Sequence, residues 1–306
     1  MNASPYTGVF PIAPTPFNED GTLDLDGMRR VLDCMIAQGV DGICILANFS
    51  EQFALTDDER EILLTLSLEH IDGRVPVIAT TSHFCTDIAV ARAKRAEEVG
   101  AAMLMMMPPY HGALLKADDQ GVFEHFAAVS EAVSIPLMVQ DAPLAGVQLS
   151  VPLLARMARE INGVRYFKME MPQAAAKLRA LIEAGGSDIE GPFDGEESIT
   201  LLADLQAGAT GTMCSALLPD LIRPVVMQFL DGDQEAARNQ YDDILPLINF
   251  ENRQCGFRAT KAAMVEGGVI KSEKVRHPVM PLHPDTRAEL IEITRRLNPV
   301  VLNWAS

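Results

Sequence analysis

The sequence predicts an α/β protein, a (β/α)8 TIM barrel with a C-terminal helical appendage, and two features of the chain predict it. Short and nearly continuous apolar runs recur along the first three quarters of the 306 residues, as expected for parallel strands that are buried on both faces. Amphipathic segments of helical length separate these runs. Eight such strand–helix units in about 225 residues are typical of the barrel.

Eight strands and the helices between them are expected from this pattern. The strands cover residues 9–13, 42–46, 75–80, 101–106, 135–140, 164–168, 188–191 and 209–213, and helices are expected at 24–38, 57–70, 86–99 and 118–132. Thr56 and Glu59 form a capping box that begins the second helix, and Gly39 and Gly100 follow helices where a left-handed residue is needed. A doubly wound sheet is the structural alternative. Such folds usually begin with a glycine-rich phosphate loop, which the sequence lacks.

Residues 1–230 are expected to form the catalytic barrel, and residues 231–306 the helical appendage. Three helical stretches follow the eighth unit, at 233–247, 251–266 and 284–297. Two adjacent glycines, Gly267 and Gly268, end the second stretch, and a proline-rich connector leads to the third.

Composition excludes several classes of function. The formal net charge is −17, from 42 acidic and 25 basic residues, so nucleic acids are not expected as partners. No apolar run of about 18 residues is present and the first residues lack the pattern of a secretory signal, so we expect a cytoplasmic protein that does not enter a membrane. The 5 cysteines are scattered, and no histidine–carboxylate cluster has the spacing of metal ligands, so no metal is expected.

Lys168 is the residue that most strongly indicates chemistry. It ends the apolar run 164–168, and barrel enzymes place their active sites at the carboxyl ends of their strands. A buried, neutral amine is the nucleophile needed to form a Schiff base with a ketone. Glu170 lies on the same side of an extended chain, two residues on, and is a candidate general acid or base. The structural alternative is a lysine that reaches solvent or forms a simple salt bridge with Glu170.

Tyr110 and the loop of Asn48, Phe49 and Ser50 follow the ends of two other strands. Tyr110 comes after two prolines that stiffen its loop, and we interpret it as an assistant in proton transfer. A surface aromatic at a subunit contact is the alternative. The Asn48–Ser50 loop is expected to present backbone N–H groups and small polar side chains to a carboxylate. The alternative there is an ordinary loop between a strand and a helix.

Gln140, Asp141 and Gly191 complete the expected substrate site. Gln140 and Asp141 stand at the end of the fifth expected strand, and Gly191 at the end of the seventh. Because the carboxyl ends of parallel strands meet at one edge of a barrel, we expect these residues to contact the same ligand as Lys168.

The order of these motifs resembles the dihydrodipicolinate synthase / N-acetylneuraminate lyase family of Schiff-base lyases, from Gly8 to about Leu297. The matching strings are the opening strand 8–17, the loop 47–51, Pro108-Pro109-Tyr110, Gln140-Asp141-Ala142-Pro143 and Phe167-Lys168-Met169-Glu170. The resemblance implies that Lys168 forms the Schiff base and that no separate cofactor is needed. It also implies a small 2-keto acid as substrate and a homotetramer arranged as a dimer of dimers.

Three departures from the family pattern indicate dehydration. Gln140 stands where a proton-relaying tyrosine is usual, and Asn48 and Phe49 replace the two threonines of the family loop. Glutamine does not donate and recover a proton as a phenol does. With Glu170 present, the sequence is similar to the dehydratase branch of the family. That likeness implies a 2-keto-3-deoxy sugar acid, 2-keto-3-deoxy-L-arabonate, as substrate in non-phosphorylative pentose breakdown, with 2-oxoglutarate semialdehyde and water as products.

Three other functions remain open at this point. The first is a class I aldolase that splits a 2-keto-3-deoxy sugar acid into pyruvate and an aldehyde. The second is a dehydratase of a keto-deoxyglucarate, which would also release CO₂. The third, from a different class, is a non-catalytic barrel that only binds a ligand, because fold does not imply function.

Overall fold

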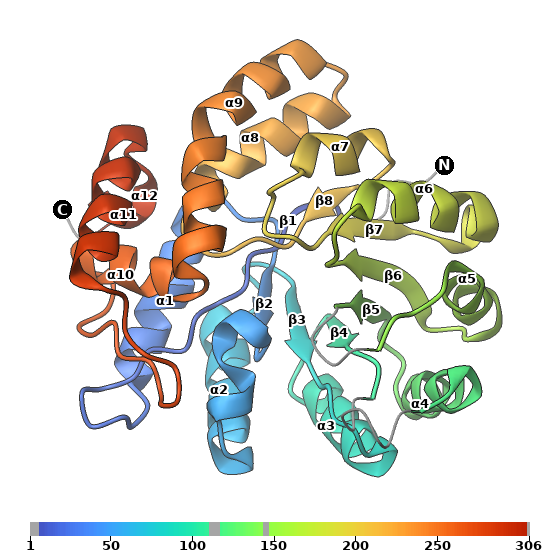
Figure 1. Cartoon of the computed structure of the whole chain (residues 1–306). Coiled ribbons are helices and arrows are strands. Elements are labelled where there is room, and N and C mark those ends of the chain that lie inside the picture. Colours follow the sequence, from blue (N-terminus) through green and yellow to red (C-terminus); the bar gives the residue numbers. More distant parts are fainter. Residues whose placement is uncertain (1–5, 110–116, 143–146, 305–306) are drawn as a thin grey trace. The chain divides into compact units, whose positions relative to one another are not determined.

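The apolar runs of the sequence form parallel strands in the computed structural model, which describes residues 6–109, 117–142 and 147–304 (Figure 1). Contacts within the chain divide it into two units. Unit 1 comprises Met1–Thr7, Pro76–Glu196 and Thr200–Met213, and unit 2 comprises Gly8–Val75, Glu197–Ile199 and Cys214–Ser306.

Unit 1 consists of alternating strands and helices. They are β3 (Val77–Thr80), α3 (Thr86–Glu98), β4 (Met103–Met106), α4 (Asp119–Ala132), β5 (Leu137–Asp141), α5 (Val151–Glu160), β6 (Val164–Met169), α6 (Ala174–Gly185), β7 (Gly191–Asp194), α7 (Leu201–Gln206) and β8 (Gly211–Thr212). Each strand from β3 to β8 pairs in parallel with the next along the chain. Figure 1 shows α3 to α6 along the outer side of these strands. The strands are therefore covered on both faces, which explains their continuous apolar sequences.

Unit 2 contains the first two strands and the C-terminal helices. Its elements are β1 (Gly8–Val9), α1 (Leu25–Ala37), β2 (Ile43–Ile45), η1 (Asn48–Ser50), η2 (Gln52–Ala54), α2 (Asp57–Ile71), α8 (Pro219–Leu230), α9 (Gln234–Phe250), η5 (Glu251–Cys255), α10 (Arg258–Glu266), α11 (Pro284–Leu297) and α12 (Val300–Asn303). Ile12 forms parallel bridges with both Cys44 and Ser215. The chain after β1 therefore lies between β2 and the residues that follow β8. The strand order β1-β8-β7-β6-β5-β4-β3-β2 is that of a (β/α)8 barrel, and the expected fold class is confirmed.

The C-terminal helices α9 to α12 belong to unit 2 together with β1 and β2. Arg30 of α1 donates from Nε to the Val269 carbonyl at 2.8 Å, and the Tyr241 hydroxyl of α9 donates to the Ser198 carbonyl at 2.8 Å. These bonds connect the appendage to barrel segments that lie far from it in sequence. A boundary between barrel and appendage at residue 230 stays a prediction.

The expected helix at 251–266 is two segments. The π-turn η5 ends at Cys255, Gly256 has a φ of 61°, and α10 begins at Arg258. The backbone at Gly256 is in the left-handed region that favours glycine, so the helix cannot continue through it. Glu251 at the start of the π-turn is fully buried, and this burial raises the pKa of its carboxyl to about 7.

The seventh strand lies later in the chain than expected. It covers Gly191–Asp194 instead of residues 188–191, and its sequence Gly-Pro-Phe-Asp is poor in residues that favour strands. The strand forms because Tyr166, Phe167 and Lys168 of β6 pair in register with its first three residues. Tertiary pairing thus overrides local propensity, and Gly191 begins the strand instead of ending it.

Two buried carboxyl groups lie between the sheet and α7. Asp194 of β7 and Asp204 of α7 are both completely buried. Thr212 Oγ1 donates to Asp194 Oδ2 at 2.5 Å, and Thr200 Oγ1 donates to Asp204 Oδ2 at 2.8 Å. Burial, and next the negative charge of Asp194, raise the pKa of Asp204 to about 7.

Asp204→Asn should therefore remove a pH dependence of stability. Since the folded-state pKa of Asp204 lies above its unfolded value, its contribution to the free energy of unfolding falls as pH rises from about 4 to about 7. Asparagine resembles the protonated acid, so at pH 8 the variant should be more stable than the wild type by on the order of 2 kcal/mol. Thermal unfolding followed by circular dichroism between pH 5 and 8 measures this. Asp243→Asn, at an exposed position of α9, is the matched control and should shift nothing.

Candidate functional site

Lys168 lies near the carboxyl end of β6, with its side chain only 3% exposed. It pairs in register with Gln140 of β5 and with Phe193 of β7. Register-paired residues of adjacent strands project from the same face of a sheet, so these three side chains share one face. A lysine amine so deeply buried requires a polar partner.

Glu170 is that partner. Lys168 Nζ lies 3.3 Å from Glu170 Oε2, and Gln140 Nε2 donates to the same oxygen at 2.6 Å. The Glu170 side chain is 21% exposed, so its carboxylate is reached by solvent while the amine beside it is buried. One carboxylate oxygen is thus held from two sides, and the carboxylate can accept the proton that Lys168 must lose before it acts as a nucleophile.

Gln140 has a second polar atom in this cluster. Its Oε1 is buried and has no hydrogen-bond partner among the described residues. Exchanging the amide oxygen and nitrogen would place two oxygens 2.6 Å apart, so the bond to Glu170 fixes the orientation of the amide. A buried acceptor without a partner costs about 1–3 kcal/mol, which a hydroxyl group of a ligand would offset.

Gly195, just after β7, provides the space for the Lys168 side chain. A Cβ atom at Gly195 would lie 2.8 Å from Lys168 Cγ and 2.7 Å from the Met169 carbonyl oxygen. Sequence reasoning missed this residue because it placed the seventh strand too early. In the sequence, a glycine directly after Phe193 and Asp194 was the feature that could have indicated a close approach of the backbone at the end of this strand.

Ser82 is a second residue that the sequence did not single out. It follows β3, is buried, and accepts a hydrogen bond at Oγ from the Met107 backbone N–H at 2.9 Å. Thr80 pairs with Met105, and Met106 pairs with Val139. Two residues beyond the first pair, Ser82 lies beside Met107, and one residue beyond the second pair, Met107 lies beside Gln140. Ser82 is therefore on the same face as Lys168.

Two expected substrate residues lie elsewhere. Asp141 pairs with Met169 and so projects from the face opposite to Lys168, where its carboxylate accepts from Lys177 Nζ at 2.5 Å. Lys177 also donates to the Leu149 carbonyl at 2.5 Å. Gly191 pairs with Tyr166 at the start of β7, and a Cβ there would meet the Tyr166 ring. Asp141 thus projects away from the Lys168 face and Gly191 lies at the opposite end of its strand, and the role of both residues in binding substrate stays a prediction. Tyr110 lies outside the described residues.

The Asn48–Ser50 loop belongs to unit 2, where it forms the short helix η1. Ser50 Oγ donates to the Ala13 carbonyl at 2.6 Å and accepts from the Ala47 N–H at 3.1 Å. The Ser50 hydroxyl is thus used in hydrogen bonds to the backbone of unit 2. Asn48 Oδ1 accepts from Gln52 Nε2 at 2.7 Å, and the Phe49 ring contacts Phe257 at 6.2 Å between centroids.

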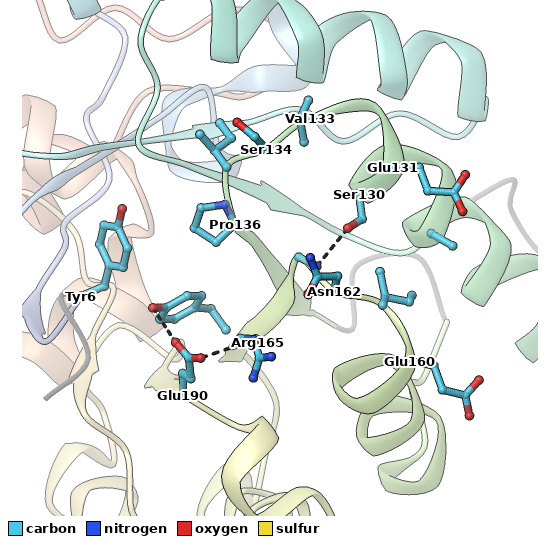
Figure 2. Close-up of a pocket in the computed structure, with 15 residues that line it drawn as sticks. Tyr6, Ser130, Glu131, Val133, Ser134, Pro136, Glu160, Asn162, Arg165 and Glu190 are labelled. Atoms are coloured by element: carbon cyan, nitrogen blue, oxygen red, sulfur yellow. Dashed lines mark hydrogen bonds and ion pairs between the residues drawn. The ribbon is translucent and has the colours of Figure 1, made fainter. Parts of the chain in front are cut away.

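A cavity of about 770 Å³ in unit 1 lies at the amino ends of the strands (Figure 2). Pro136, Gly163 and Glu190, which precede β5, β6 and β7, contribute to its wall. Figure 2 shows the ion pair between Glu190 and Arg165. Arg165 Nε lies 3.4 Å from Glu190 Oε1, and the Tyr166 hydroxyl donates a hydrogen bond to the other oxygen of this carboxylate at 3.2 Å. Catalytic residues of barrels lie at the opposite ends of the strands, so we do not place the reaction here.

Residues 6–109, 117–142 and 147–304 contain neither a metal-binding cluster nor a membrane-spanning helix. Within these ranges, no group of three or more His, Cys, Asp or Glu side chains is arranged to hold a metal ion. No helix in the same ranges is both long and apolar enough to cross a bilayer.

Comparisons with known proteins agree with this geometry. The model of the dihydrodipicolinate synthetase family matches residues 5–297. The chain is 58% identical over 300 residues to L-2-keto-3-deoxyarabonate dehydratase of Azospirillum brasilense, covering 98% of this chain and 97% of that one. It is 30% identical to 4-hydroxy-tetrahydrodipicolinate synthase 1 of Halalkalibacterium halodurans, covering 93% and 94% of the two chains. A solved dihydrodipicolinate synthetase structure from Pseudomonas aeruginosa superposes with a TM-score of 0.88 at 31% identity, over 96% of this chain and 100% of that one.

Gly195→Ala should displace Lys168. The added methyl overlaps Lys168 Cγ and a backbone carbonyl, and such overpacking typically costs about 1–3 kcal/mol. The rate at which borohydride traps a pyruvate adduct on Lys168, followed by intact-protein mass spectrometry, should fall roughly 10- to 100-fold. Gly121→Ala is the matched control, since its Cβ would make ordinary contacts at 3.4 Å and 3.5 Å. Equal trapping in both variants would contradict the role given to Gly195.

Proposed function

Because the chain belongs to the dihydrodipicolinate synthetase family, we propose that it is a Schiff-base-forming dehydratase that converts 2-keto-3-deoxy-L-arabonate to 2-oxoglutarate semialdehyde and water. The observation that carries the proposal is that Lys168 and Gln140 both contact the same carboxylate oxygen of Glu170. The 58% identity to a dehydratase of this substrate supports the same reaction.

Lys168 is the nucleophile of the proposed reaction. Glu170 takes the proton from the amine, and Nζ then attacks the C2 ketone of the substrate. Glu170 returns this proton to the former C2 carbonyl oxygen, which leaves as water, so that a protonated imine forms and the Glu170 carboxylate is regenerated. The positive imine nitrogen withdraws electrons from C2, which makes the C3 protons acidic. The reaction needs no cofactor beyond this covalent bond.

Glu170 is the group that moves protons on the covalent intermediate. Its carboxylate removes a C3 proton, which leaves an enamine, and the resulting carboxylic acid protonates the C4 hydroxyl. The electron pair of the enamine expels that hydroxyl as water. Loss of a C5 proton gives an enol that becomes the aldehyde, and hydrolysis of the imine releases the product. One water leaves in imine formation and one is consumed in hydrolysis, so the net change is the single water lost from C4.

Gln140 favours this reaction over cleavage of a carbon–carbon bond. Aldol cleavage needs a base that takes the proton of the C4 hydroxyl, and an amide does not do so. An amide can instead fix the Glu170 carboxylate through Nε2 while its Oε1 accepts a hydrogen bond from a substrate hydroxyl. The phenol of Tyr110 is proposed to assist the proton transfers.

The substrate carboxylate is proposed to bind the Asn48–Ser50 loop. Ser50 contributes through the hydrogen bonds of its hydroxyl to the Ala13 carbonyl and the Ala47 N–H, which fix the backbone of the loop. Substrate contacts of Asp141 and Gly191 stay predictions, with Asp141 on the face opposite to Lys168 and Gly191 at the start of β7. We also propose the cytoplasmic location and the homotetramer, a dimer of dimers, that the family resemblance implies.

Glu170→Gln tests the role of the carboxylate. The amide keeps the size of the side chain but cannot move a proton, so kcat for dehydration should fall by about 10²–10⁴-fold. The borohydride-trapped adduct with pyruvate should still form, because Lys168 remains, but more slowly, because Glu170 no longer accepts the proton of the amine. Unchanged turnover in this variant would exclude Glu170 as the acid and base.

The products distinguish dehydration from the other functions. Mass spectrometry of reactions with a panel of C5 and C6 2-keto-3-deoxy acids should reveal a five-carbon product 18 mass units lighter than its C5 substrate. Pyruvate among the products would identify an aldolase, and released CO₂ a keto-deoxyglucarate dehydratase. The absence of any product or trapped adduct would favour a barrel that only binds a ligand.

A further inference from the structure

A cluster of four charged side chains in unit 2 begins at Glu51, directly after the Asn48–Ser50 loop, and two of the four are buried while the other two are each 20% exposed. It consists of Glu51, Glu59, Lys261 and Arg276, and we call it the ion cluster. Lys261 Nζ donates to Glu51 Oε1, and the Lys261 side chain is completely buried while that of Glu51 is 3% exposed. Arg276 donates from NH1 to Glu59 Oε2 at 2.6 Å and from its backbone N–H to Glu51 Oε2 at 3.3 Å.

The ion cluster joins four segments of unit 2. Arg276 donates to the Gly21 carbonyl at 2.8 Å and to the Ala54 carbonyl at 2.7 Å. Lys261 Nζ donates to the Lys274 carbonyl at 2.8 Å. The ring of Phe17 lies 4.5 Å from Lys261 Nζ and 4.4 Å from Arg276 Cζ, so both cations also contact one aromatic side chain.

The position of Glu51 makes its charge relevant to the loop. Glu51 has a φ of 59°, a conformation that few side chains adopt without support, and it follows Ser50 immediately. A carboxylate next to a loop that binds an anion would repel that anion. Burial lowers the pKa of Lys261, while the charge of Glu51 opposes this effect and favours the ammonium form. The cluster then holds two positive and two negative charges and is neutral.

We propose that Lys261 is a positioning and charge-compensating residue for the substrate carboxylate. It holds Glu51, and with it the Asn48–Ser50 loop, and it cancels the negative charge that would otherwise face an anionic substrate. The inference rests on the proposed function, because it takes from it a keto acid bound at this loop. Local compensation matters in a chain of net charge −17, whose overall field disfavours anions.

Single substitutions in the pair should act in opposite directions. Lys261→Met leaves Glu51 uncompensated, so the pyruvate concentration that half-saturates adduct trapping should rise about tenfold or more. Glu51→Gln leaves Lys261 uncompensated and keeps a hydrogen-bond acceptor, so that concentration should stay the same or fall. In the double variant it should return to within about threefold of the wild-type value.

Methyl pyruvate separates charge from structural support. It forms the same imine but carries no carboxylate, so neither single substitution should shift its half-saturating concentration by more than about twofold. Lys271→Met removes one positive charge from an exposed position of the same connector and is the matched control, with no expected shift for either compound. Circular dichroism confirms that each variant is folded.

The outcomes separate this inference from the proposed function. Equal shifts for pyruvate and methyl pyruvate, or weaker pyruvate trapping in both single variants, would mean that the pair only supports the fold, and the inference would be overturned. If Lys261→Met does not fold, Glu51→Gln alone decides, because weaker trapping of pyruvate there contradicts charge compensation. No adduct in the wild-type protein would overturn the proposed function and this inference with it.

Discussion

Burial of an amine at the end of β6 is the constraint on which the rest of the site depends. The Lys168 side chain is 3% exposed, and such a group is stable only with a polar partner and with space for its methylenes. Glu170 supplies the partner, Gln140 fixes the carboxylate, and the missing side chain of Gly195 supplies the space. The same carboxylate that stabilises the buried lysine is also within reach of any group bound to it covalently.

Side chains alternate between the two faces of a parallel sheet, and this alternation places the polar groups of the proposed site on one face and polar groups that support the fold on the other. Lys168 and Gln140 project from one face of the sheet, while Asp141 projects from the other toward the helices. On that outer face Asp141 pairs with Lys177, and Asp194 and Asp204 are buried with threonine hydroxyls as partners. Asp141 and Lys177 thus join β5 to α6, and Asp194 and Thr212 join β7 to β8, on the face opposite to Lys168.

Unit 2 also contains a buried lysine that requires a carboxylate partner, but the arrangement of charges around it differs. Its Glu51–Lys261 pair is buried more deeply than Lys168–Glu170 and is joined to Arg276 and Glu59 in a neutral cluster. A buried ion pair contributes little net stability by itself, because desolvation offsets the attraction. Its retention next to the Asn48–Ser50 loop is more readily explained by the geometry and charge that it gives to that loop.

The sequence by itself determined the features that depend on neighbours along the chain. The order of strands and helices, the capping box of Thr56 and Glu59, the bounds of α11 and the common side of Lys168 and Glu170 all follow from local periodicity and capping. Only the tertiary structure decided the position of β7, the fit of Gly195 against Lys168 and the bond from Gln140 to Glu170. These features depend on the register between strands about 30 residues apart in sequence, which no local pattern encodes.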